Sequence, residues 1–250
     1  MYKPFIQLLM CLFLAHLVGD FLLQTSSLAK KKQKSAWMMA LHSLINGAVS
    51  YLLLANWTIW LVPLIITVSH FLIDFAKSRF KKDSLWLFLA DQVLHLSIIL
   101  LLVVLYLLPN NINSYWFQNF PKIAPVITVM LSSLILLTFA GGVFVGYCVR
   151  PFQDQIKSYY EKLKKNPVEG LKEGGKVIGW LERLLIFVFV LTGQYAGVGF
   201  LIAAKSVFRF GELKESENRK EAEYIIIGTF ISFLIALAVS ILARMALGIK

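Results

Sequence analysis

Long apolar runs, separated by short polar segments, restrict the fold of this chain more than any other feature. Of its 250 residues, 58% are hydrophobic and only 16% are charged, whereas a soluble domain carries roughly 25% charged residues. Runs of about 18 apolar residues or more are long enough to cross a membrane as helices. We therefore expect an all-α polytopic transmembrane bundle of about seven helices, near residues 4–24, 36–55, 59–76, 85–108, 123–149, 180–204 and 224–246.

The net charge of +11 is explained by the loops between these runs. Clusters of basic residues follow the first and third runs: Lys30, Lys31, Lys32 and Lys34, and then Lys77, Arg79, Lys81 and Lys82. Because basic loops stay in the cytoplasm, we expect the N-terminus outside and the C-terminus inside. No soluble module is long enough to dock a duplex, so the positive charge does not indicate nucleic-acid binding.

The loops also suggest four parts. A four-helix transmembrane module covers 1–108, and a fifth helix with its outer loop covers 109–149. A basic cytoplasmic connector covers 150–179, either with an amphipathic helix on the headgroups or as a solvated linker. A transmembrane pair covers 180–250, although the GQYAG sequence at 193–197 also permits a re-entrant hairpin in place of the sixth span. Cys11 and Cys148 are too far apart in sequence to form a metal knuckle or a disulfide framework.

All four histidines lie in the first four apolar runs, and each has a carboxylate or amide four positions away. The pairs are His16 with Asp20, His42 with Asn46, His70 with Asp74, and Asp91 with His95. Residues four apart share one face of a helix, and ionisable groups inside membrane helices usually face the bundle interior. The four pairs therefore predict a single shared site.

The order within each pair predicts two levels in the membrane. The first and third helices run towards the cytoplasm and the fourth runs away from it, so the change from HxxxD to DxxxH keeps the levels aligned. His16, His70 and His95 would form one level, and Asp20, Asp74 and Asp91 a second level about 6 Å nearer the cytoplasm. His42 would lie at the aspartate level and Asn46 at the histidine level.

Several segments resemble a bacterial inner-membrane family that is known only as a domain of unknown function. AHLVGDFLLQ, ALHSLING, HFLIDFAKSRF and FLADQVLHL resemble its N-terminal part, and GGKVIGWLERLL, GFLIAAKSVFRFGELK and AEYIIIGTFISFL resemble its C-terminal part. The resemblance implies a multi-pass protein of the bacterial cytoplasmic membrane and carries no established reaction. A weaker similarity connects the chain to membrane proteins described as metal-dependent hydrolases.

A metal site explains the four pairs best, since imidazole and carboxylate ligands suit zinc, and also iron or manganese. We expect one or two ions on ligands drawn from His16, Asp20, His42, His70, Asp74, Asp91 and His95. Three histidines with an open fourth position would be the usual form of a catalytic zinc site. Asp74 or Asp91 would act as the catalytic base. The amides of Gln24, Asn46 and Gln92 would hydrogen-bond to the metal ligands and orient them.

The predicted function is a metal-dependent hydrolase that acts on a lipid or an amphiphile from the cytoplasmic side, with membrane lipids as its partners. The leading alternative is an ion or proton transporter that uses the His/Asp cluster as a relay or an ion site. The fourth run is almost wholly apolar from Ile98 outward, which disfavours a polar path through the membrane. A bis-histidine haem site and a purely structural cluster are two further alternatives.

Overall fold

The computed structural model describes residues 4–32, 35–80, 83–163, 171, 173–210 and 219–249, and contains no strand among them. The chain divides into two compact units, Met1–Ile135 and Leu136–Lys250. Six helical stretches in the described part are long and apolar enough to cross a membrane: Pro4–Leu22, Ala36–Leu54, Leu61–Ser78, Leu85–Leu107, Ile123–Lys162 and Lys220–Ala246. This confirms the prediction of an all-helical membrane protein with about seven spans.

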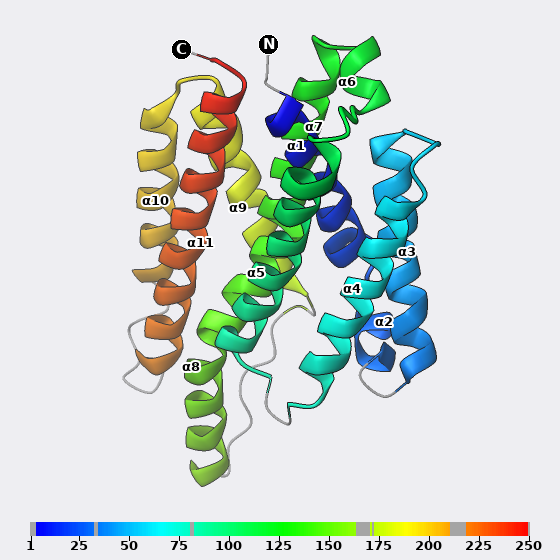
Figure 1. The fold of residues 1–250 in the computed structure, drawn as a ribbon. Helices are drawn as coiled ribbons and strands as arrows, with labels where there is room; N and C mark the ends of the chain where they lie inside the picture. The colour runs from blue at the N-terminus through cyan, green and yellow to red at the C-terminus, as the bar shows by residue number, and fades with distance from the viewer. Residues whose placement is uncertain are drawn as a thin grey trace. The chain divides into compact units, whose positions relative to one another are not determined.

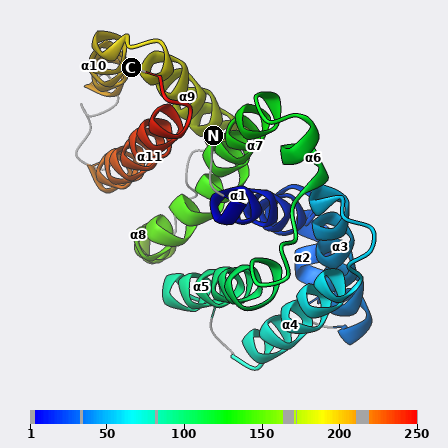
Figure 2. The same cartoon turned by 45° about the horizontal axis from the view of Figure 1, so that its top comes forward.

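The first unit is a bundle around the N-terminal helix (Figures 1 and 2). Its elements are α1 (Pro4–Leu17), η1 (Val18–Leu22), α2 (Ser26–Lys32), α3 (Ala36–Leu54), α4 (Leu61–Ser78), α5 (Leu85–Leu102), η2 (Val103–Leu107), α6 (Tyr115–Asn119) and α7 (Ile123–Ile135). Both η elements are π-helical turns that continue the preceding α-helix. Helix α1 contacts α3, α5 and α7, whereas α4 packs between α3 and α5. The short helices α2 and α6 lie in segments that we expected to be loops.

Polar residues at the helix ends explain where the long helices begin. The Ser35 hydroxyl accepts a hydrogen bond from the Met38 amide at the start of α3, and the Ser84 hydroxyl accepts one from the Leu87 amide at the start of α5. Each hydroxyl satisfies one of the unpaired amides of a first helical turn. The two capped helices therefore begin at residues that their sequences specify.

Four helices turn a regular stripe of residues towards the interior of the first unit. Each stripe takes every fourth residue, and all sixteen residues are buried: Leu8, Leu12, His16 and Asp20 on α1 and η1; His42, Asn46, Ser50 and Leu54 on α3; Val62, Ile66, His70 and Asp74 on α4; Asp91, His95, Ile99 and Val103 on α5 and η2. Four residues overshoot one α-helical turn by about 40°. The π-helical turn at η1 uses more residues per turn, which offsets this drift at Asp20.

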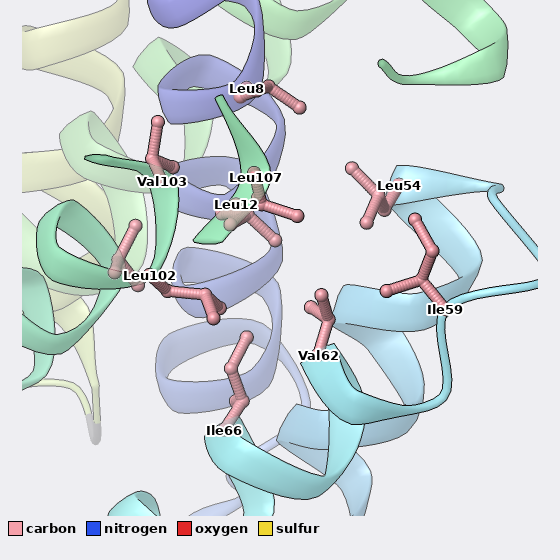
Figure 3. Packing of buried hydrophobic residues seen from close by; sticks show 10 residues of the cluster. Leu8, Leu12, Leu54, Ile59, Val62, Ile66, Leu102, Val103 and Leu107 are labelled. Carbon is pink, nitrogen blue, oxygen red and sulfur yellow. The ribbon is translucent and has the colours of Figure 1, made fainter. Parts of the chain in front are cut away.

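One end of these stripes is wholly apolar (Figure 3). The buried cluster consists of Leu8, Leu12, Leu54, Ile59, Val62, Ile66, Ile99, Leu102, Val103 and Leu107. It joins α1, the end of α3, the start of α4 and the end of α5. The histidines and aspartates occupy the other end of the same stripes, and the apolar cluster therefore fixes the four helices that carry them.

The second unit contains η3 (Leu136–Ala140), α8 (Gly141–Leu163), α9 (Gly174–Leu191), α10 (Tyr195–Phe210) and α11 (Arg219–Ala246). The single helix expected over 180–204 is wrong: α9 ends at Leu191, the chain reverses at 192–194, and α10 packs against α9. Gly193 has a φ of +73°, a backbone conformation that glycine adopts without strain. The reversal falls within GQYAG, and a re-entrant course of this pair in the membrane stays a prediction. The predicted topology, with the N-terminus outside and the C-terminus inside, counted 180–204 as one crossing. If α9 and α10 both cross, an N-terminus outside would place the C-terminus outside as well. The sidedness of both ends stays a prediction.

The predicted connector at 150–179 is helical in its first part. Helix α8 continues through Pro151 as far as Leu163, and α9 begins at Gly174. Residues 164–170 and 172 lie outside the described residues, as do 33–34 and 81–82 of the basic loops. The choice between an amphipathic helix on the headgroups and a solvated linker for the connector at 150–179 therefore stays a prediction.

Candidate metal centre

All residues predicted as metal ligands lie in the first unit, inside the bundle. Their exposed fractions, together with that of Asn46, lie between 0% and 8%: His16, Asp20, His42, Asn46, His70, Asp74, Asp91 and His95. Burying so many ionisable groups in a membrane helix bundle is costly unless they are paired or hold an ion. Their mutual distances therefore indicate what the cluster can do.

Four atoms from three of the stripes form a compact tetrahedron. They are Asp20 Oδ1, His42 Nε2, His70 Nε2 and Asn46 Nδ2, and the six distances between them run from 3.1 to 3.4 Å. The two imidazole nitrogens are 3.1 Å apart, and lie 3.2 Å (His42) and 3.1 Å (His70) from the shared carboxylate oxygen. Donor atoms from η1, α3 and α4 thus converge on one point.

The size of this tetrahedron matches a zinc site. The centre of a regular tetrahedron lies about 0.61 of an edge from each corner, here about 2.0 Å, which is the length of Zn–N and Zn–O bonds in proteins. An amide can turn by about 180° and exchange its oxygen and nitrogen. Asn46 can therefore present an oxygen to a cation at the centre, as the two histidines present nitrogens.

The local chain around Asp20 is shaped to hold this amide. Gly19 lies against the side chain of Asn46, and a Cβ at Gly19 would overlap the amide group. Both Gly19 and Asp20 belong to the π-helical turn η1, and such turns are frequent at functional sites. The residue before the aspartate therefore has to be glycine for Asn46 to reach the corner of the tetrahedron.

Asp74 extends the cluster towards α5. Its Oδ2 lies 3.8 Å from the Nε2 atoms of both His42 and His70. Besides the tetrahedron, further sets of described residues offer one ligand atom each within 4.8 Å of one another: His16, Asp20 and His70; His42, His70 and Asp74; and Asp74, Asp91 and His95. The carboxylates thus connect neighbouring groups into one buried centre.

Two lysines reach the centre, and the sequence did not single them out. Lys32, at the end of α2, lies 3.1 and 2.9 Å from the two carboxylate oxygens of Asp74. Lys77, at the end of α4, lies 2.9 Å from Asp91 Oδ2. Both had been explained by the basic-loop pattern alone. The one signal that could have found Lys77 is its place one helical turn after Asp74.

The three predicted amides have different surroundings. Gln92 connects α1 to α5, since its Oε1 lies 3.1 Å from His16 Nε2 and its amide donates to Asp91 Oδ2 at 3.1 Å. Asn46 contacts three donor atoms of the tetrahedron directly. Gln24 Oε1 is buried and has no hydrogen-bond partner within the described part of the chain. Gln92 is thus in a position to orient His16 and Asp91, whereas Asn46 forms a corner of the tetrahedron.

The three histidines predicted to share a level do lie together. The rings of His70 and His95 stack with their centroids 4.0 Å apart, and His16 lies 5.3 Å from His95 and 6.3 Å from His70. Each of these histidines also lies in a candidate ligand group that contains a carboxylate, such as His16, Asp20 and His70, or Asp74, Asp91 and His95. Mixed histidine and carboxylate sets are therefore available beside the stacked rings.

A small cavity borders the histidines on the side of the apolar cluster. Its walls include His16, Asn46, His70 and His95, together with Ser50, Ile66, Ser69, Ile98 and Ile99. It has room for about one water molecule. A water there would lie beside both the stacked rings and the Asn46 amide.

Residues 8–123 match a sequence family described as "Protein of unknown function (DUF3307)". The matched segment contains every histidine and aspartate of the centre. No curated protein sequence and no solved structure matches the chain. The chain is thus similar, over residues 8–123, to an uncharacterised family, and its described part has helices long and apolar enough to cross a membrane and buried His/Asp groups that could hold a metal ion.

Proposed function

We propose that the first unit binds a divalent transition-metal ion, zinc in the first place, between Asp20, His42, Asn46 and His70. The tetrahedron of donor atoms carries this proposal, because its edges of 3.1 to 3.4 Å leave a centre at zinc-ligand distance from every corner. Two imidazoles, a carboxylate and an amide oxygen also suit iron or manganese.

The chemistry we propose for this centre is hydrolysis of a lipid or an amphiphile in a bacterial cytoplasmic membrane. A bound metal ion activates a coordinated water as a nucleophile. Asn46 is the only neutral amide among the four corners and also lines the cavity, so a water can take its place. Asp74 or Asp91 would accept the proton of that water. An open, largely apolar groove on α3 and α4, the two helices that carry His42 and His70, would accommodate an amphiphilic substrate.

Ion transport is the second candidate, and one observation favours it. The four corners come entirely from the protein, and a shell filled by four protein ligands is typical of a site that binds without catalysing. Such a site would pass its ion on by exchanging ligands with the neighbouring carboxylates. The alternative therefore predicts metal movement across vesicles, with no cleavage of any lipid.

The two candidates are separated by assays on the same purified full-length protein. We expect zinc-loaded protein in detergent to cleave one or more members of a panel of lipid carboxyl esters and phosphodiesters, and chelation to stop it. Asp20→Asn, which keeps the side-chain shape, should be inactive, whereas Ser97→Ala, at an exposed position on α5, should match the wild type. Zinc uptake into protein-containing vesicles, with no cleavage of any panel member, would overturn the hydrolase proposal in favour of transport.

A further inference from the structure

Asp91 and His95 point two unpartnered atoms at one another on the α5 side of the centre. Asp91 Oδ1 and His95 Nε2 are both buried, neither has a hydrogen-bond partner within the described residues, and they lie 3.7 Å apart. Leaving a buried polar atom without a hydrogen-bond partner is energetically costly. Asp74 offers a third oxygen within 4.8 Å of both residues' ligand atoms. This arrangement of two carboxylates and an imidazole indicates a ligand that bonds to all three.

The same two carboxylates are held by lysine ammonium groups from the surface. The side chains of Lys32 and Lys77 are 13% and 25% exposed, whereas those of Asp74 and Asp91 are 3% and 5% exposed. Each lysine therefore extends from the solvent-accessible edge of the bundle to a buried oxygen. The ammonium groups neutralise carboxylates that would otherwise be buried as unpaired charges.

The charges show that the lysines and a second ion exclude one another. Three aspartates and two lysines leave the centre with one negative charge, and a divalent ion in the tetrahedron changes this to one positive charge. A second divalent ion beside both lysines would raise the charge to three positives in a medium of low dielectric constant. Withdrawal of the two lysines would return the total to one positive charge, so the ion and the ammonium groups compete for the same carboxylates.

We propose that Asp74, Asp91 and His95 form a second divalent-cation site, and that Lys32 and Lys77 hold its carboxylates until the ion displaces them. The inference rests on the metal function proposed above and adds a loading step to it. Asp74 would bridge the two ions, because its Oδ2 also faces His42 and His70 at 3.8 Å. Three protein donors would leave the second ion a position for water.

The first test removes the lysine charges in the full-length protein. Wild type, Lys32→Met/Lys77→Met and the control Lys31→Met, whose side chain is exposed on the same short helix, are dialysed against buffered zinc and analysed for metal. We expect the double variant to bind its second ion at least about 10-fold more tightly than wild type, with Lys31→Met unchanged. If the double variant binds its second ion no more tightly than wild type, the inference is overturned, whereas binding of the first ion still supports the proposed function. Absence of any ion in wild type overturns the proposed function instead.

The second test uses the wild-type protein and does not depend on a variant that folds. The protein is treated briefly with an amine-acetylating reagent at zinc concentrations that fill one site or two, and each lysine is quantified by mass spectrometry. We expect acetylation of Lys32 and Lys77 to rise several-fold when the second ion binds, whereas acetylation of Lys31 stays constant. Binding of a second ion with no rise at Lys32 and Lys77 would contradict the proposed displacement.

Discussion

The interior of the first unit has two halves that are built on the same helix faces. On α1 the stripe changes from Leu8 and Leu12 to His16 and Asp20, and on α4 it changes from Val62 and Ile66 to His70 and Asp74. Both halves are buried to the same degree, with no member more than 8% exposed. The difference between them is therefore chemical and not geometric.

This comparison indicates a division of labour along the helices. The apolar half (Figure 3) packs side chains that need no specific partner, and dispersion and close packing hold it together. In the polar half every ionisable group needs a partner, and three of its atoms, His42 Nδ1, Asp91 Oδ1 and His95 Nε2, have no hydrogen-bond partner in the described structure. A bundle held together by packing alone could have continued the apolar stripe to its end, and an ion bound in the polar half would offset the cost of burying these groups.

The largest expected effect comes from removing a corner of the tetrahedron. His70→Ala should weaken zinc binding by more than the roughly 100-fold that loss of an orienting residue can cost, because His70 Nε2 contacts all three other corners. His16→Ala should lower zinc affinity by about 10-fold, since His16 bonds to Gln92 and lies 3.9 Å from Asp20. Zinc titrations of both variants would measure the difference. Equal losses in the two variants would favour the three-histidine set over the tetrahedron.

A substitution in the apolar half should separate stability from metal binding. Leu12 is 0% exposed, and Leu12→Ala should lower the free energy of unfolding by about 2–5 kcal/mol through the cavity it leaves. The metal content of the folded protein should stay at the wild-type value. Thermal unfolding in detergent, followed by metal analysis of the folded fraction, measures both quantities. If Leu12→Ala lost its metal while still folded, the two halves would not be independent.

A smaller effect is expected at Gly19, where the backbone supports the centre. In Gly19→Ala the new methyl group would displace the Asn46 amide and leave three corners in place. We expect zinc affinity to fall by about 10-fold, within the range for loss of a supporting contact. Gly146→Ala on α8 is the control, because a Cβ there meets no atom within 4 Å. Equal affinities in the two variants would remove Asn46 from the ligand set.

Sequence patterns predicted the membrane bundle and the convergence of the four pairs because both depend on helical periodicity alone. The fourfold spacing from His16 to Asp20 and from Asp91 to His95 identifies a common face whatever the packing of the helices. The role of Asn46 depends on the orientation of an amide beside Gly19, which spacing does not encode. Lys32 and Lys77 were hidden because topology already explained basic residues near the ends of the first and third helices.

The C-terminal half was less predictable for a related reason. Apolar composition made 180–204 look like one span, whereas a single positive φ at Gly193 divides it into α9 and α10. Charged side chains then connect the helices of the second unit. Lys205 on α10 lies 2.6 Å from Glu182 on α9, and Arg183 on α9 donates to Ser232 Oγ on α11 at 2.8 Å. Pairing of this kind depends on how the helices cross, and the order of residues along the chain does not reveal it.

The central claim is that the polar half exists to hold a metal ion, and the metal content of the purified protein tests it most directly. The full-length chain is extracted in detergent without added metal, and elemental analysis is made of wild type beside Asp20→Asn. We predict about one zinc ion per wild-type chain, or iron or manganese in its place, and a clear loss in Asp20→Asn. Wild-type protein that is folded, holds no metal and takes up none from buffered zinc would contradict the account.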